Sequence, residues 1–121
     1  MTAPFVWFDL TADDGGTARE FYAGLFGWPI GPGAGEYQGW ITDGDRPWAG
    51  ILPAATGTAG GVPAGRWVPY VAVDDLDAAA KQAIELGGRV VRDKTTGPAG
   101  TSVTVADPSG GLVALFTPTA A

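Results

Sequence analysis

Cysteine and histidine are both absent from this 121-residue chain. Without cysteine there is no disulfide framework and no thiolate nucleophile. Without histidine the chain lacks the commonest general base and the commonest metal ligand of proteins. Any catalytic site must therefore use carboxylates, hydroxyl groups or the substrate itself, and a Ser-His-Asp triad is excluded.

Basic residues are also scarce, since 7 Lys and Arg stand against 13 Asp and Glu, for a formal net charge of −6. The basic residues are scattered and form no stripe that could follow a phosphate backbone, so we expect no nucleic-acid partner. No apolar run approaches the roughly 20 residues of a membrane helix, and the first residues lack the basic segment of a signal peptide. We therefore expect a cytoplasmic protein with no membrane partner.

What the chain does contain is a repeat. The segment FVWFDLTADDGGTAREFYAGLFGWPI aligns without a gap with WVPYVAVDDLDAAAKQAIELGGRVV, placing Asp13 on Asp74 and Gly27 on Gly88. Further along, ITDGDRPWAGIL aligns with VADPSGGLVALF, again without a gap, and places Ile41 on Val105. Two ungapped alignments in the same order indicate two related modules in a single domain of 121 residues.

Each module is predicted to run strand, helix and three further strands. The aspartate pairs at 13–14 and 74–75 are suited to begin helices, and the glycines at 27 and 87–88 to end them. In the first helix the spacing of Ala18, Phe21, Tyr22 and Leu25 predicts one apolar stripe. The strands are expected at residues 6–11, 28–30, 37–42 and 48–52, and again at 68–73, 89–93, 101–106 and 112–117.

The predicted fold class is therefore α+β, with two tandem βαβββ modules. The first module covers about residues 5–53 and the second about residues 67–118. Residues 54–66, rich in Gly, Ala and Pro, form the linker between them.

Paired modules with a strand–DD–helix–G opening and a closing DPSGG turn resemble the vicinal oxygen chelate superfamily. This group contains glyoxalases, bleomycin-resistance proteins and extradiol dioxygenases, and the resemblance covers essentially the whole chain. It implies a cup-shaped mixed sheet with the helices on its outer face and a ligand cavity inside. For members of this size it also implies a homodimer.

Metal-dependent members of this superfamily place a histidine on the first strand of each module and a glutamate or histidine on the last strand. The corresponding positions in this chain are Trp7, Gly50, Val68 and Ala114. None of these side chains can donate an electron pair to a divalent cation. We therefore expect no metal and no cofactor, and no metal-dependent glyoxalase or dioxygenase activity.

Strand alternation predicts which side chains line the cup. The aromatic rings among them suit a planar or aromatic guest, and Asp9 could pair with a cation or accept hydrogen bonds from the guest. The alternative is that the rings fill a core and that Asp9 is a solvated carboxylate at a strand end. The predicted ligand-binding residues are Trp7, Asp9, Gln38, Trp40, Trp48, Tyr70, Thr104 and Phe116.

The leading hypothesis is a metal-free binding protein of the bleomycin-resistance kind, which sequesters an aromatic small molecule such as an antibiotic without chemistry. The alternative is a metal-independent isomerase, cyclase or lyase that uses Asp9 and Tyr70 as an acid/base pair, since burial among rings raises the pKa of a carboxyl group. A third possibility is a protein whose cavity is closed by its own side chains and which has only an interaction role.

Overall fold

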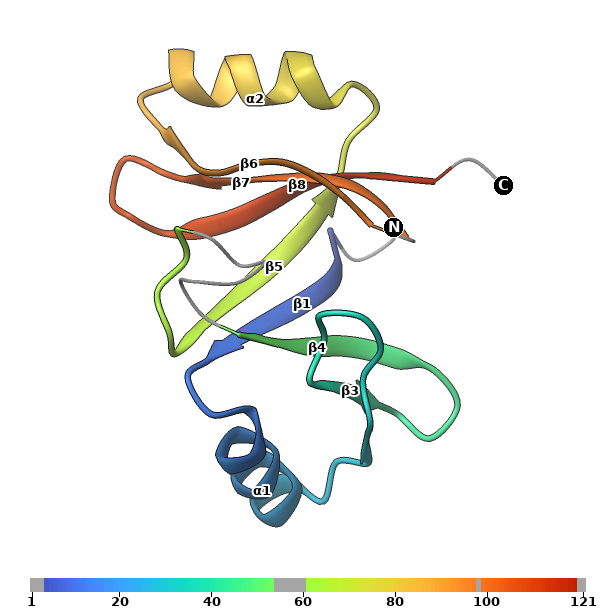
Figure 1. Cartoon of the computed structure of the whole chain (residues 1–121). Coiled ribbons are helices and arrows are strands. Elements are labelled where there is room, and N and C mark those ends of the chain that lie inside the picture. Colours follow the sequence, from blue (N-terminus) through green and yellow to red (C-terminus); the bar gives the residue numbers. More distant parts are fainter. Residues whose placement is uncertain (1–3, 54–60, 98, 120–121) are drawn as a thin grey trace. The chain divides into compact units, whose positions relative to one another are not determined.

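The structure is a computed structural model that describes residues 4–53, 61–97 and 99–119 (Figure 1). Over these residues the order of elements is βαβββ twice, which confirms the α+β class and the repeat. The elements are β1 (Phe5–Ala12), α1 (Gly15–Phe26), β2 (Ile30–Gly31), β3 (Gly39–Thr42), β4 (Pro47–Pro53), β5 (Arg66–Ala72), α2 (Leu76–Glu85), β6 (Arg89–Gly97), β7 (Gly100–Ala106) and β8 (Leu112–Pro118).

The chain divides into two compact units with the same strand pairing. The N-terminal unit, Trp7–Trp67, orders its strands β2-β3-β4-β1, and the C-terminal unit, Met1–Val6 with Val68–Ala121, orders them β6-β7-β8-β5. In each unit the first strand of the module runs parallel to the last strand, and the other neighbouring strands are antiparallel.

The register of the two units is also the same. Asp9 pairs with Gly50 across β1 and β4, and Tyr70 pairs with Ala114 across β5 and β8. The two ungapped alignments place Asp9 on Tyr70 and Gly50 on Ala114. The offsets read from the sequence therefore correspond to equivalent backbone positions in the two units.

The helices begin as their aspartates predict. The side chain of Asp14 accepts a hydrogen bond from the Thr17 N–H at 3.2 Å, and that of Asp75 accepts one from the Ala78 N–H at 3.0 Å. Each bond satisfies one of the amide groups left without a partner in a first helical turn. Helix α1 ends at Gly27, whose φ of 71° lies in the left-handed region that glycine adopts without strain.

In the C-terminal unit, α2 lies along one face of the strands β6, β7 and β8 (Figure 1). Leu76 of α2 and Val103 and Val105 of β7 are buried at the centre of this contact. The half-buried side chains packed against them are also aliphatic: Val73, Ala80, Ala83, Val90, Val113 and Leu115.

In the N-terminal unit, the face toward α1 contains the fully buried Ile41 and Ile51. A Cβ atom added to Gly39 would meet Ile51 and Arg19, which places this face of β3 and β4 against α1. Beside it lies a group of ring contacts that we call the α1 aromatic cluster, consisting of Phe8, Tyr22, Phe26, Trp28, Trp48 and Trp67.

Two expectations need adjustment. Phe21 and Leu25 are each 59% exposed, so the predicted stripe is only partly buried. Helix α1 instead turns Tyr22 toward Trp28 and Trp67, where ring stacking and a hydrogen bond hold it. Strands β2 and β3 are shorter than predicted, and residues 54–60 of the predicted linker lie outside the described residues.

No helix in the described part of the chain is long and apolar enough to span a membrane.

Candidate functional site

A buried carboxylate lies near the middle of β1. Asp9 is only 2% exposed. Its Oδ1 atom accepts a hydrogen bond from the indole Nε1 of Trp7 at 2.7 Å and another from the Tyr37 hydroxyl at 2.9 Å. Hydrogen bonds to an ionised acceptor are stronger than those between neutral groups, so these two donors fix the orientation of the Asp9 carboxylate.

Three aromatic rings surround this carboxylate. Tyr37 and Trp40 lie 4.2 Å apart between ring centroids, and Trp7 meets Trp40 edge-on at 5.8 Å. Trp7 also meets Tyr37 edge-on at 6.3 Å. All three rings are half-buried, so part of each remains exposed. We call these three rings and Asp9 the Asp9 cluster.

The register of the sheet explains why these side chains share a face. Gly50 pairs with both Asp9 and Trp40, and directly paired residues lie on the same side of a sheet. Gly39 and Ile51 pair on the opposite side, which is the side that α1 covers. The structure therefore confirms that Trp7, Asp9 and Trp40 come together on the face away from α1, as strand alternation predicts.

Trp48 does not belong to this group, and the prediction that it shares their face is wrong. Its ring contacts Phe8, Trp28 and Trp67 in the α1 aromatic cluster. The reason is a register shift: Ile41 pairs with Ala49, but Thr42 pairs with Pro47, which leaves Trp48 as an extra residue. Such a bulge changes the face to which a side chain points.

Gln38 also departs from its predicted place. It precedes β3, is exposed, and its side chain lies against Gly15 at the first residue of α1. The chain turns at Gly35, where φ is 62°, so regular alternation begins only with Gly39. The prediction that Gln38 lies beside Trp40 within one strand is therefore wrong.

Tyr37 is the member of the cluster that sequence reasoning missed. Alternation within a strand over 37–42 would turn Tyr37 away from Trp40, but Tyr37 lies in the loop before β3. The position of Tyr37 is revealed only by the structure, in which Gly50 leaves space for a ring beside Trp40. A Cβ atom placed on Gly50 would collide with the ring of Tyr37.

The other predicted ligand contacts lie in the C-terminal unit. Tyr70 pairs with Ala114, which pairs with Thr104, and Phe116 meets Tyr70 edge-on at 5.8 Å between centroids. These residues lie on the face away from α2, whereas Val103 and Val105 lie toward it. The predicted face is confirmed for these three residues, and their contact with a ligand stays a prediction.

The metal centre of the vicinal oxygen chelate superfamily does not fit the residues of the N-terminal unit. At the two relevant positions, Trp7 donates a hydrogen bond to Asp9 and Gly50 has the Tyr37 ring above it. In the part of the chain that the structure describes, no three His, Cys, Asp or Glu residues are grouped so as to hold a metal ion. The absence of a metal from the working protein stays a prediction of the sequence.

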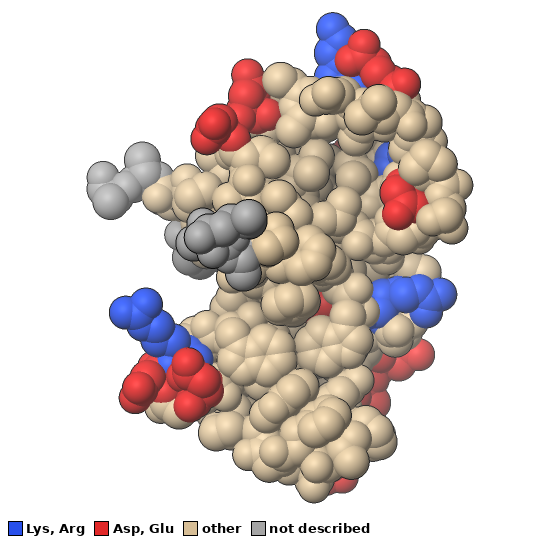
Figure 2. Space-filling view, turned by 180° about the vertical axis from the view of Figure 1, so that it is seen from behind, with Lys and Arg blue, Asp and Glu red and all other residues tan. Residues whose placement is uncertain are grey.

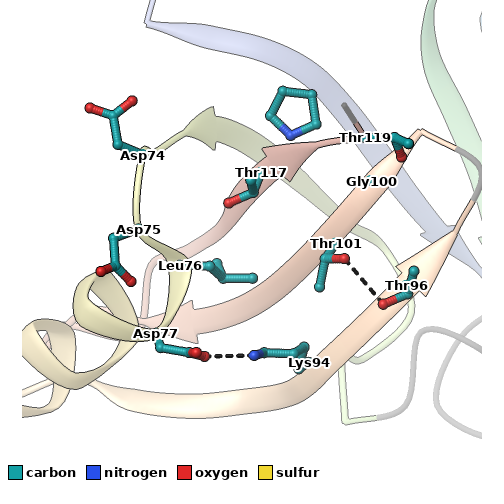
Figure 3. Close-up of a pocket in the computed structure, with 11 residues that line it drawn as sticks. Asp74, Asp75, Leu76, Asp77, Lys94, Thr96, Gly100, Thr101, Thr117 and Thr119 are labelled. Atoms are coloured by element: carbon teal, nitrogen blue, oxygen red, sulfur yellow. Dashed lines mark hydrogen bonds and ion pairs between the residues drawn. The ribbon is translucent and has the colours of Figure 1, made fainter. Parts of the chain in front are cut away.

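A separate hollow lies in the C-terminal unit, between the start of α2 and the ends of β6, β7 and β8 (Figure 3). Its charged groups include three aspartates, and Asp77 forms an ion pair with Lys94 at 2.6 Å. Both partners are more than half exposed, so this pair contributes little to stability. The hollow is open to solvent, and it contains none of the predicted ligand-binding residues.

One face of the described part of the chain carries no stripe of basic side chains (Figure 2). On the face shown in Figure 2 the Lys and Arg side chains stand apart from one another, with acidic side chains beside several of them. A stripe of basic residues is the usual electrostatic footprint of a nucleic-acid-binding protein. The absence of a nucleic-acid partner remains an expectation, as does the predicted homodimer.

The comparison with protein families identifies the domain. A family model described as a glyoxalase-like domain matches residues 6–116. The chain belongs to this family. Sequence relatives of the glyoxalase-like chain include CFP32 of Mycobacterium bovis, which carries the provisional name glyoxylase and is 35% identical over 116 residues. They also include the anthracycline biosynthesis protein DnrV of Streptomyces peucetius, 37% identical over 101 residues.

These matches cover 91% of this chain and 44% of CFP32, and 70% of this chain and 36% of DnrV. The chain thus spans less than half the length of the curated relatives that it matches. Among solved structures, the methylmalonyl-CoA epimerase of Streptomyces coelicolor has a TM-score of 0.63 at 17% identity, with 99% of this chain and 100% of the epimerase covered. This likeness shows that the two chains share a fold, and the family model over residues 6–116 is what assigns the domain to its family.

Proposed function

We propose that this glyoxalase-like protein binds a planar aromatic small molecule at the Asp9 cluster, without a metal. The observation that carries the proposal is a carboxylate, only 2% exposed, held by Trp7 and Tyr37 and surrounded by three half-buried rings. A buried carboxylate is costly unless its hydrogen bonds are satisfied, so a cluster built around one calls for a functional reason.

The chemistry of the cluster supports a flat guest. An aromatic pair adds about 0.5–1.5 kcal/mol beyond the burial of area, and the exposed parts of Trp7 and Trp40 offer surface for such a contact. The Asp9 carboxylate adds a negative charge beside the rings, which favours a guest with an ammonium group near its edge. The acidic net charge of −6 favours neutral or cationic guests over anionic ones.

The relatives point to the same class of compound. DnrV and its counterpart DauV of Streptomyces sp. (strain C5) are both named as anthracycline biosynthesis proteins. Anthracyclines are planar, fused-ring aromatic compounds, and a surface with three aromatic rings suits a molecule of that shape. Sequestration of such a compound would place the protein with the bleomycin-resistance proteins of its superfamily.

One observation favours a second candidate, a metal-independent isomerase, cyclase or lyase. The Tyr37 hydroxyl lies 2.9 Å from the Asp9 carboxylate, within the range over which a general acid/base pair exchanges a proton. In this alternative Tyr37 takes the role that sequence reasoning gave to Tyr70. Turnover would then require Asp9, and Asp9→Asn would abolish it even where the guest still binds.

The proposal can be tested by tryptophan fluorescence with two probes, a neutral dihydroxyanthraquinone and an anthraquinone that carries an aminoalkyl chain. We expect Trp40→Ala to raise Kd for both probes about ten-fold or more, because a stacking partner is lost. Trp28→Ala, which removes a ring of the α1 aromatic cluster, is the matched control and should change Kd by less than about two-fold. Asp9→Asn should weaken binding of the amine probe only. Equal losses in Trp40→Ala and Trp28→Ala would contradict the assignment of the site.

A further inference from the structure

Gly50 lies at the centre of the Asp9 cluster, where the sheet leaves room for a ring. It pairs with Asp9 on one side and with Trp40 on the other. A Cβ atom at this position would collide with Cε1 and Cδ1 of Tyr37 and would lie 3.3 Å from Trp40. The Tyr37 ring therefore lies directly over the Gly50 backbone.

The backbone of Gly50 does not itself require glycine. The φ angle of Gly50 is not positive, so an alanine could adopt the same backbone conformation. The requirement is one of space alone. It contrasts with the equivalent position in the C-terminal unit, where Ala114 carries a methyl group and pairs with Thr104 in place of a tryptophan.

Tyr37 is held at both ends of its side chain. The hydroxyl donates to Asp9 Oδ1 at 2.9 Å, and the ring packs against Trp40 with centroids 4.2 Å apart. Because one side chain touches both the carboxylate and the stacking ring, the placement of Tyr37 fixes the distance between them. Tyr37, which lies in a loop, thus holds the side chains of the strand residues Asp9 and Trp40 in place.

We infer that Tyr37 is a positioning residue for ligand binding and that it acts together with Gly50. The glycine admits the Tyr37 ring into the space where metal-dependent members carry a ligating side chain. The Tyr37 ring in turn fixes the relative positions of Asp9 and Trp40, so that both can contact a flat guest. This inference rests on the proposed function, since it assigns a task to Tyr37 within that same site.

A thermodynamic cycle tests the pairing without any guest. Gly50→Ala, Tyr37→Ala and the double variant are compared by urea unfolding. If the added methyl group acts by displacing the Tyr37 ring, each single variant should lower the folding equilibrium constant about ten-fold, and the double variant should be no less stable than Gly50→Ala alone. Gly31→Ala, at a strand glycine with open space around it, is the control and should be near neutral. Additive losses would overturn the pairing.

Binding of the neutral dihydroxyanthraquinone tests the positioning role. Gly50→Ala and Tyr37→Ala should each raise Kd about ten-fold, and the double variant should match them. Tyr37→Phe keeps the ring and should restore affinity to within about three-fold of the original chain. Unchanged affinity in Tyr37→Ala would overturn the role of Tyr37 while leaving the aromatic site in place. Failure of the original chain to bind either anthraquinone would instead overturn the proposed function, and the cycle would still decide the pairing.

Discussion

The two units have the same strand pairing and the same register but different side chains at matching positions. At the centre of the face away from the helix, the N-terminal unit has Asp9, Gly50 and Trp40, and the C-terminal unit has Tyr70, Ala114 and Thr104. The helix caps and turns that determine the backbone path lie elsewhere in each module. The same backbone arrangement therefore carries different side chains in the two units, and the carboxylate with its surrounding rings belongs to the N-terminal unit.

The faces toward the helices differ as well. Helix α2 packs on a compact aliphatic core, whereas the side of α1 carries the α1 aromatic cluster beside Ile41 and Ile51. Large rings need more room than valines and leucines, and several of them remain half-buried. Each helix side therefore has a buried centre with half-buried side chains around it, which are mainly aromatic in the N-terminal unit and aliphatic in the C-terminal unit.

The largest expected effect comes from deleting side chains at matching core positions. Ile51 is completely buried, and its counterpart Leu115 in the C-terminal unit is half-buried. We expect Ile51→Ala to lower the free energy of unfolding by about 4 kcal/mol and Leu115→Ala by about 2 kcal/mol, because the better enclosed site loses more contacts and leaves a larger cavity. Urea unfolding measures both. If Leu115→Ala lowers the free energy of unfolding more than Ile51→Ala does, the inference that Ile51 is the better enclosed of the two side chains is contradicted.

A smaller effect separates the two tryptophans that sequence reasoning grouped together. The Trp48 ring contacts three rings of the α1 aromatic cluster, and the Trp40 ring contacts Trp7 and Tyr37. We expect Trp48→Ala to cost about 3 kcal/mol of unfolding free energy and Trp40→Ala about 1–2 kcal/mol, with the loss of guest affinity in the reverse order. Denaturation and fluorescence titration on the same samples give both rankings. Equal losses of guest affinity in Trp48→Ala and Trp40→Ala would indicate that Trp48 belongs to the binding surface after all.

The sequence was a good guide wherever a short-range rule determines the structure. The aspartates at the helix starts, Gly27 at a helix end and the ungapped register between modules all depend on local chemistry, and they were predicted. Alternation then placed Trp7, Asp9 and Trp40 correctly, because these residues lie on paired strands.

The sequence failed where periodicity is interrupted. Trp48 follows a register shift that depends on how β3 and β4 pair, and no local pattern marks that shift. Tyr37 lies in a loop, where no periodicity applies, and only its contact with Gly50 and Asp9 reveals its role. The two residues most informative about the site therefore lie beyond the reach of alternation.

The smallest expected effect concerns the matching hairpin turns before β4 and β8. Asp43 accepts hydrogen bonds from the N–H groups of Asp45 and Arg46, both at 2.9 Å. Asp107 accepts from the N–H and hydroxyl of Ser109 at 2.7 and 2.6 Å and from the Gly111 N–H at 3.0 Å. These bonds favour the ionised form, so the pKa of each carboxyl group lies below its ordinary value of 3.8.

A lowered pKa in the folded state has a defined consequence for stability. The stabilisation is complete above the ordinary pKa and is lost as the pH falls through the lower, folded-state value. Asparagine keeps an acceptor oxygen but does not titrate. We therefore expect Asp107→Asn to reduce the fall in Tm between about pH 5 and about pH 2, and Asp43→Asn to do so to a smaller extent because its charge accepts fewer bonds. Asp45→Asn, which removes one charge from the same turn as Asp43, is the control. If all three variants flatten the Tm profile equally, net charge governs the acid sensitivity and the turn hydrogen bonds do not.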